Sequence, residues 1–299
     1  MTGGPSGDPG GPSADLNGRR ALAAGERVLL VDSKDRRRLV RLVPGGRYHS
    51  HAGVLEHDCL IGRPEGSSAK SDRGARFVAV RPTLADVVIA MPRGAQVVYP
   101  KDLGAILMAA DVFPGARVLE AGVGSGALSM ALLRAGADVL GYEVRDDFAA
   151  AARENVSSFL GETGRYSVIS SDVYEGISQR GLDRVVLDLP EPWRVVGHAA
   201  AAMRPGGILV SYLPSISQVS ELRSTLGRSD FGMEESFEVL QRGWHVAGRA
   251  VRPDHRMVAH TGFLTVARLL SPDPDPRVVG EARNVTDVAD ETERPVEEG

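Results

Sequence analysis

The sequence has a single cysteine, Cys59, among its 299 residues and lacks any apolar run long enough to cross a membrane. One thiol excludes an intramolecular disulfide and any zinc site that needs two thiolates, and it is typical of a reducing compartment. A spanning helix needs about 20 mostly apolar residues, and the N-terminus lacks the basic-then-apolar order of a secretory signal. These absences predict a cytoplasmic protein with no membrane partner.

Both ends of the chain are poor in apolar side chains. Half of residues 1–18 are Gly or Pro, and residues 271–299 carry nine acidic side chains against three arginines. Such segments bury too little apolar surface to offset the entropy of ordering their backbone. We expect disordered tails over residues 1–20 and 271–299. Residues 19–270 hold 32 basic and 28 acidic residues, a balance that permits a nucleic-acid partner.

The pattern of apolar residues changes near residue 92. Before it, short β runs alternate with turn residues, which predicts a small β domain over residues 21–92. After it, apolar strands alternate with helical stretches, which predicts a mostly parallel sheet with helices on both faces over residues 93–270. The expected strands are 26–31, 37–42, 76–80, 118–120, 139–143, 184–187 and 208–212, and the expected helices are 127–133 and 147–156.

A glycine-rich segment, Glu120-Ala121-Gly122-Val123-Gly124-Ser125-Gly126, stands where a strand ends and a helix begins. Glycines there permit a tight turn and let a ligand approach backbone N–H groups. Dinucleotide sites prefer the spacing G-x-G-x-x-G, whereas this spacing, with an acid before it, is typical of S-adenosylmethionine loops. A glycine turn without a ligand is the alternative.

Acidic residues follow the next two strands. Glu143 lies about 20 residues beyond Gly122, where a carboxylate accepts the hydroxyls of an adenosine ribose, although the same spacing serves NAD. Ser171 and Asp172 follow a further strand and are expected near the adenine amine, with a helix cap or turn as the alternative role.

The segment Asp188-Leu189-Pro190-Glu191-Pro192-Trp193 directly follows an apolar strand. Two prolines fix the backbone and remove donors, so the segment leaves the sheet as a stiff loop that holds Asp188 at the strand's carboxyl end. Ligands of doubly wound sheets bind at this edge. Loops of this kind grip the planar nitrogen in amino-group methyltransferases, so Asp188 is a candidate catalytic residue. Trp193 is a candidate stacking surface or a core residue.

Four further motifs accompany these segments: Met91-Pro92-Arg93-Gly94, Gln96 to Asp102, Leu240-Gln241-Arg242-Gly243-Trp244 and His260-Thr261-Gly262-Phe263-Leu264. Together with the glycine-rich segment and the Asp188 segment, they make the chain resemble the family of tRNA adenine-58 N1-methyltransferases. The resemblance implies a class I S-adenosylmethionine-dependent methyltransferase fold (α/β, Rossmann-like, seven strands), a small N-terminal β domain, a homotetramer, and methyl transfer to a T-loop adenine of tRNA. It also implies cofactor contacts from Gln96, Gly122 to Gly126, Glu143, Ser171, Asp172 and Asp188, and target contacts from Asp188 and Tyr99.

Three other functions are alternatives. An NAD-dependent oxidoreductase is disfavoured by the glycine spacing. A protein carboxyl methyltransferase of the isoaspartyl type would share the glycine loop but would not need the Asp188 segment. A non-catalytic RNA-binding subunit is disfavoured by the intact Gly122, Gly124, Glu143 and Asp188.

Histidines and arginines offer two weaker signals. His49, His51 and His57 have spacings compatible with metal ligands, but imidazoles in a β domain also serve as hydrogen-bond partners, and we expect no metal. Arg36 to Arg38, Arg41 and Lys101 are candidate contacts to RNA phosphates, with a solvated surface as the alternative.

Overall fold

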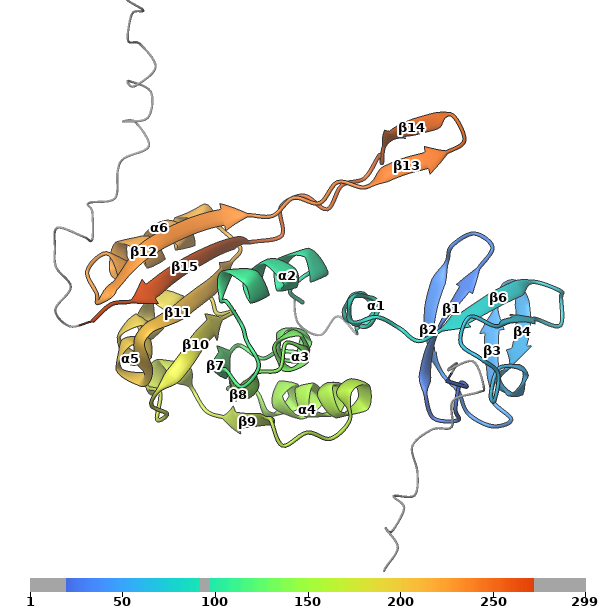
Figure 1. The fold of residues 1–299 in the computed structure, drawn as a ribbon, viewed down its shortest axis with the longest axis horizontal. Helices are drawn as coiled ribbons and strands as arrows, with labels where there is room; N and C mark the ends of the chain where they lie inside the picture. The colour runs from blue at the N-terminus through green and yellow to red at the C-terminus, as the bar shows by residue number, and fades with distance from the viewer. Residues whose placement is uncertain (1–19, 92–96, 272–299) are drawn as a thin grey trace, which may run out of the picture. The chain divides into compact units, whose positions relative to one another are not determined.

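The computed structural model describes residues 20–91 and 97–271, and it divides into two compact units after Pro92 (Figure 1). In the N-terminal unit, four antiparallel strands form a sheet in the order β2-β1-β6-β5, and β3 pairs with β4 beside it. The strands are β1 (Arg27–Asp32), β2 (Arg37–Arg41), β3 (Arg47–Ser50), β4 (Gly53–Glu56), β5 (Ser68–Lys70) and β6 (Arg76–Val80).

Alternate side chains along these strands point inward and form the core of the N-terminal unit. Val28 and Leu30 of β1 and Phe77 and Ala79 of β6 are buried together with apolar residues of the loops. A short 3-10 helix (His57–Cys59) follows β4. The unit ends with α1 (Leu84–Ala90), which starts at a capping box formed by Thr83 and Asp86.

The C-terminal unit contains a seven-stranded sheet in the order β12-β15-β11-β10-β7-β8-β9. Five neighbouring strands, from β11 to β9, are parallel, and β15 is antiparallel to both β11 and β12. The central strand β10 is buried along its whole length, as expected for a strand covered on both faces. The strands are β7 (Arg117–Ala121), β8 (Asp138–Glu143), β9 (Tyr166–Ser170), β10 (Leu182–Leu187), β11 (Met203–Leu213), β12 (Phe231–Glu238) and β15 (Phe263–Leu269).

Helices cover both faces of this sheet. On one face, α3 packs between α2 and α4, while α5 and α6 pack against β11 and its antiparallel neighbours on the other (Figure 1). The helices are α2 (Pro100–Ala109), α3 (Ala127–Arg134), α4 (Asp146–Leu160), α5 (Val196–Ala202) and α6 (Ile216–Leu226), with short 3-10 helices at Val173–Glu175 and Pro192–Val195. The predicted fold, a doubly wound methyltransferase-type sheet with a small β domain, is confirmed.

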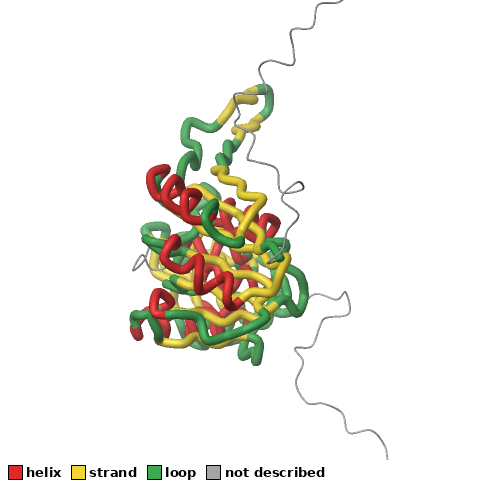
Figure 2. Tube along the Cα trace, turned by 90° about the vertical axis from the view of Figure 1, so that its left-hand side faces the viewer, coloured by secondary structure: helices red, strands yellow, loops and turns green. Residues whose placement is uncertain are grey.

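A thin hairpin leaves the antiparallel end of the sheet between β12 and β15. Its strands, β13 (Trp244–Ala247) and β14 (Ala250–Pro253), extend away from the sheet (Figure 2). The strand pattern did not predict this hairpin. None of the helices in the described residues combines the length and the apolar character of a membrane span.

Candidate functional site

The glycine segment and Asp188 meet at one edge of the sheet. β7 and β10 are parallel neighbours whose last residues, Ala121 and Leu187, are paired, and β8 lies on the other side of β7. The chain thus leaves β7 and β10 at a point where the strand order reverses, which is where doubly wound sheets bind ligands. The backbone N–H of Asp188 donates to the carbonyl of Ala121 over 2.9 Å, which fixes the start of the proline loop beside the glycine loop.

Gly122 and Gly126 have backbone conformations that require glycine. Gly122 has φ +84°, and a Cβ atom there would lie 2.1 Å from the carbonyl oxygen of Asp188. Gly126 has φ +82° where α3 begins, and a Cβ there would lie 3.2 Å from Ala152 of α4. The close approach of the two loops therefore depends on the absence of a side chain at position 122.

Glu143 is tied to the glycine loop. Its buried carboxylate accepts from the N–H of Gly124 over 3.0 Å through Oε2, and from the N–H of Arg145 over 3.0 Å through Oε1. Glu143 is therefore not a solvated carboxylate at the end of its strand. The side chain holds the loop in place beside the carboxyl end of β8.

Ser171 and Asp172 line a hollow of about 350 Å³ that also includes Tyr142 and the segment from Glu175 to Ser178. The N–H of Ser171 donates to the carbonyl of Glu143 over 3.1 Å, which joins the ends of β8 and β9. Asp172 Oδ1 accepts from the N–H of Tyr174 over 2.8 Å and caps the following 3-10 helix. Asp172 thus has the capping role given above as its alternative, and it also lines this hollow.

Asp188 is partly buried, and burial raises the pKa of its carboxyl to about 7. The loop behind it is held by two distant side chains. Gln218 Nε2 donates to the carbonyl of Pro190 over 2.9 Å, and the N–H of Glu191 donates to the Tyr174 hydroxyl over 3.1 Å. Trp193 is half-buried and packs against the apolar core of the C-terminal unit, in agreement with the core role weighed for it.

Glu120, the acid before the glycines, is fully buried in β7. Its Oε2 accepts from Ser129 Oγ over 2.6 Å, and the Tyr166 hydroxyl donates to the same Ser129 oxygen over 3.1 Å. Its Oε1 has no partner among the described residues. Burial raises the pKa of Glu120 to about 8, so a neutral acid supports the glycine loop at neutral pH.

Tyr99 directly precedes α2, and 41% of its surface is exposed. Lys101, two residues later, is not available for RNA. Its Nζ is buried and donates to Asp102 over 2.7 Å, to Thr261 Oγ1 over 2.6 Å and to the Val239 carbonyl over 2.7 Å. The predicted phosphate contact from Lys101 is therefore wrong, because its ammonium is neutralised inside the protein. Gln96 lies outside the described residues.

Tyr212, on β11 beside β10, was missed by the sequence analysis. Its hydroxyl is buried, and no atom in the described part of the chain lies in position to form a hydrogen bond with it. Burial, together with the charges of Asp102 and Asp188, raises the pKa of Tyr212 to about 12. The side chain thus lies within electrostatic range of Asp188. Only the pairing of β11 with β10 places it there, so no local signal could have found it.

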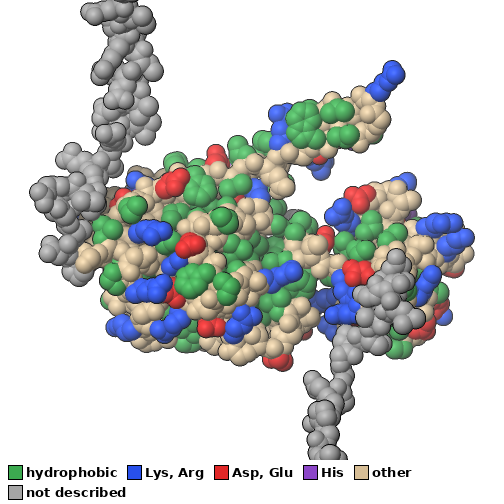
Figure 3. Space-filling model, viewed as in Figure 1, with side chains coloured by type: hydrophobic (Ala, Val, Ile, Leu, Met, Phe, Trp, Pro, Cys, Tyr) green, Lys and Arg blue, Asp and Glu red, His purple; other side chains and the backbone are tan. Residues whose placement is uncertain are grey.

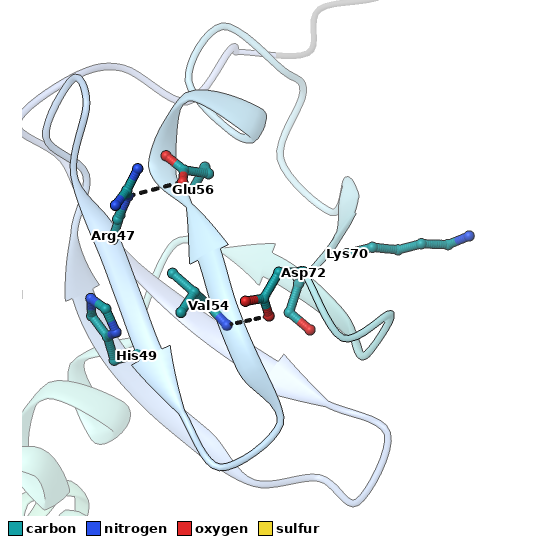
Figure 4. Close-up of a pocket in the computed structure, with 7 residues that line it drawn as sticks. Arg47, His49, Val54, Glu56, Lys70 and Asp72 are labelled. Atoms are coloured by element: carbon teal, nitrogen blue, oxygen red, sulfur yellow. Dashed lines mark hydrogen bonds and ion pairs between the residues drawn. The ribbon is translucent and has the colours of Figure 1, made fainter.

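The histidines of the N-terminal unit are dispersed. His57 is buried and its Nδ1 accepts from the N–H of Val43 over 3.1 Å, while His49 and His51 are exposed. His49 lies at a hollow of about 400 Å³ in which Arg47 pairs with Glu56 over 2.9 Å (Figure 4). Within residues 20–91 and 97–271, no three His, Cys, Asp or Glu side chains are grouped to hold a metal.

Two of the predicted basic contacts already have acidic partners. Arg36 pairs with Asp32 over 2.6 Å, and Arg37 lies 3.4 Å from Asp35 and 3.6 Å from Asp86. Binding of RNA by Arg36 to Arg38 and by Arg41 stays a prediction.

Comparison with protein families identifies two matches. Residues 77–252 match the model described as tRNA methyltransferase complex GCD14 subunit, and residues 21–68 match the TrmI-like N-terminal model. The tRNA (adenine(58)-N(1))-methyltransferase TrmI of Thermus thermophilus is 38% identical over 245 residues, which are 81% of this chain and 96% of that protein. The tRNA (adenine(57)-N(1)/adenine(58)-N(1))-methyltransferase TrmI of Methanocaldococcus jannaschii is 34% identical, covering 82% and 95%.

Two solved structures share the whole fold. A SAM-dependent O-methyltransferase from Thermotoga maritima superposes with a TM-score of 0.81 at 31% identity and covers 85% of this chain and 97% of its own. The tRNA (m1A58) methyltransferase TrmI from Aquifex aeolicus superposes with a TM-score of 0.76 at 29% identity, covering 84% and 100%.

Proposed function

The chain belongs to the family of tRNA (adenine-58-N1)-methyltransferases, and from this premise we propose that it methylates N1 of adenine 58 in tRNA, with S-adenosylmethionine as the methyl donor. The resemblance noted in the motifs is thereby confirmed. One observation carries the proposal: Asp188 starts a braced loop whose backbone packs on Gly122, so a carboxylate lies beside the glycine loop at the edge where such sheets bind ligands.

The loop residues fit a donor that carries a nucleoside. Gly122 brings the turn against the Asp188 backbone, and Val123, Gly124, Ser125 and Gly126 complete the turn into α3. In this proposal, Glu143 binds the ribose hydroxyls while it holds the loop, and Ser171 and Asp172 bind the adenine end in their hollow. Bound S-adenosylmethionine supplies an electrophilic methyl group on a sulfonium.

Asp188 and Tyr99 act on the target base. N1 of adenine has an in-plane lone pair and is unprotonated at neutral pH, so the reaction needs alignment more than a base. The product ring is a cation. An ionised Asp188 that accepts a hydrogen bond from the exocyclic N6 amine orients the ring and stabilises the positive charge as it develops. Tyr99, exposed at the start of α2, serves as a second positioning group.

We further propose that the chain forms a homotetramer and acts in the cytoplasm, where a tRNA substrate is found. The support for assembly is the β13–β14 hairpin, since an isolated two-stranded hairpin is marginally stable in water. Trp244 is 59% exposed and Val246 is 69% exposed on one of its faces, an apolar surface suited to a second copy. Sedimentation at equilibrium should give four times the 31.8 kDa chain mass.

Methyl transfer to a tRNA transcript tests the function. The purified protein should incorporate one methyl group per tRNA from labelled S-adenosylmethionine, and a matched transcript with adenine 58 replaced by guanine should accept none. Nucleosides from the digested product should include 1-methyladenosine. Equal incorporation into both transcripts, or labelling of protein instead of RNA, would contradict the proposal.

A further inference from the structure

The arm, residues 240–260, is the part of the C-terminal unit that projects from the sheet (Figure 1). It consists of the β13–β14 ladder, preceded by one further bridge between Gln241 and Val258. Gly248 and Arg249 form the two-residue turn at its tip, and Gly248 has φ +57°, as expected at the first position of a hairpin turn of type II′. At about 3.3 Å per residue, the eight residues from Leu240 to Ala247 can reach roughly 25 Å from the sheet.

The register gives the hairpin two chemically different faces. Trp244 lies opposite Pro253 and Val246 opposite Val251, while His245 lies opposite Arg252 in the alternate position. Because successive side chains of a strand point to opposite faces, the first two pairs form an apolar face and the third belongs to a basic face. Both faces are exposed, and apolar and basic side chains are visible along the arm (Figure 3).

The charge of the arm is almost entirely of one sign. It contains four arginines, no lysine and a single acid, Asp254. Among the residues that the structure describes, none of these arginines is ion-paired with a carboxylate, and Arg252 donates to the Pro253 carbonyl over 3.4 Å. This contrasts with Arg36 and Lys101, whose charges are neutralised within their own units. The four arginines are Arg242, Arg249, Arg252 and Arg256.

We propose that the basic face and tip of the arm bind the phosphate backbone of the tRNA substrate at a distance from the methylated base. The proposal rests on the proposed function, which supplies a polyanionic partner. Guanidinium groups bind phosphate oxygens with two parallel hydrogen bonds, and a thin hairpin presents them without steric obstruction. A second copy of the chain fits the basic face poorly, since a two-fold contact between two such faces would place arginines of like charge on both sides of the interface. The apolar face of the arm remains available for contact with a second copy of the chain in the proposed tetramer.

The test compares two double variants of the full chain. R249Q/R252Q removes two charges from the basic face and tip, whereas R165Q/R228Q removes two exposed charges elsewhere in the C-terminal unit. Binding of unmodified tRNA is measured by fluorescence anisotropy from 50 to 300 mM salt. Each phosphate contact releases about one counterion, so R249Q/R252Q should lower the slope of log K against log salt by about 2 and weaken binding at least about tenfold near 0.1 M salt.

The controls separate RNA binding from assembly and catalysis. R249K/R252K keeps both charges and should retain most of the affinity, and R165Q/R228Q should retain the wild-type slope. R249Q/R252Q should keep the wild-type mass and the wild-type kcat at saturating tRNA, with a raised KM. An unchanged slope, an equal loss in R165Q/R228Q, or a change of mass would overturn the proposal. Failure of the wild type to methylate tRNA would instead defeat the proposed function.

Discussion

Replacing Asp188 by asparagine should make the protein more stable and almost inactive. Burial raises the pKa of Asp188 from 3.8 to about 7, so the folded protein resists ionisation of this carboxyl. One pKa unit corresponds to about 1.4 kcal/mol, which gives about 4 kcal/mol for the full shift. Because the side chain is only partly buried, we expect a gain of about 2 to 4 kcal/mol in the free energy of unfolding of D188N at pH 8.

The pH dependence of this gain has a defined sign. The folded-state pKa is higher than the unfolded-state pKa, so the folded state retains the proton longer and the wild type loses stability as pH rises from about 4 to about 7. Asparagine does not titrate. The stability difference between D188N and the wild type should therefore be near zero below pH 4, grow up to pH 7 and stay constant above it.

Three assays of D188N test this reasoning. Scanning calorimetry of the protein without donor should show a Tm higher by roughly 4 to 16 °C at pH 8, at about 2–4 °C per kcal/mol. Methyl transfer should fall at least about a hundredfold in D188N and in D188A, while the affinity for S-adenosylhomocysteine stays nearly intact. The wild-type kcat/KM should rise with an apparent pKa near 7. Unchanged turnover, or a Tm difference that is the same at pH 4 and pH 8, would refute the argument.

The remaining predictions concern the loop, the buried ion pair and the acidic end of the chain. G122A should abolish S-adenosylhomocysteine binding in calorimetric titration, because its Cβ would clash with the Asp188 carbonyl 2.1 Å away; wild-type affinity would show that the two loops move apart freely. K101M should lower the free energy of unfolding by about 3–5 kcal/mol, measured by urea denaturation, because Asp102 loses its buried cation; a change below about 1 kcal/mol would contradict this. Deletion of residues 271–299 should leave tRNA methylation unchanged, since a segment with nine acids repels RNA, and a large loss of rate would show that it contributes.

Local chemistry made much of the site predictable. Glycine spacing after one strand, Glu143 after the next and a proline-braced Asp188 after another each carry a signal within a few residues. Parallel strands bring their carboxyl ends to one edge, so these signals converge once the sheet is recognised. The contacts from Gly124 to Glu143 and from Asp188 to Ala121 follow from that arrangement.

Contacts between distant segments were not predictable. The sequence predicts that Lys101 is a surface cation. In the structure its ammonium is enclosed at the start of α2 by the neighbouring Asp102 and by Thr261, which is 160 residues away in the chain. Burial of Tyr212 near Asp188 depends on the pairing of β10 with β11. The two strands of the arm are only four residues long and lack a buried face, so periodicity gave no sign of a hairpin.

A crystal structure with S-adenosylhomocysteine bound would test the central claim most directly. We predict density for this molecule against the loop from Gly122 to Gly126, its ribose hydroxyls on Glu143, and the Asp188 carboxylate directed toward the open side of its sulfur. Density bound elsewhere, or a carboxylate that points away from the sulfur, would contradict the account.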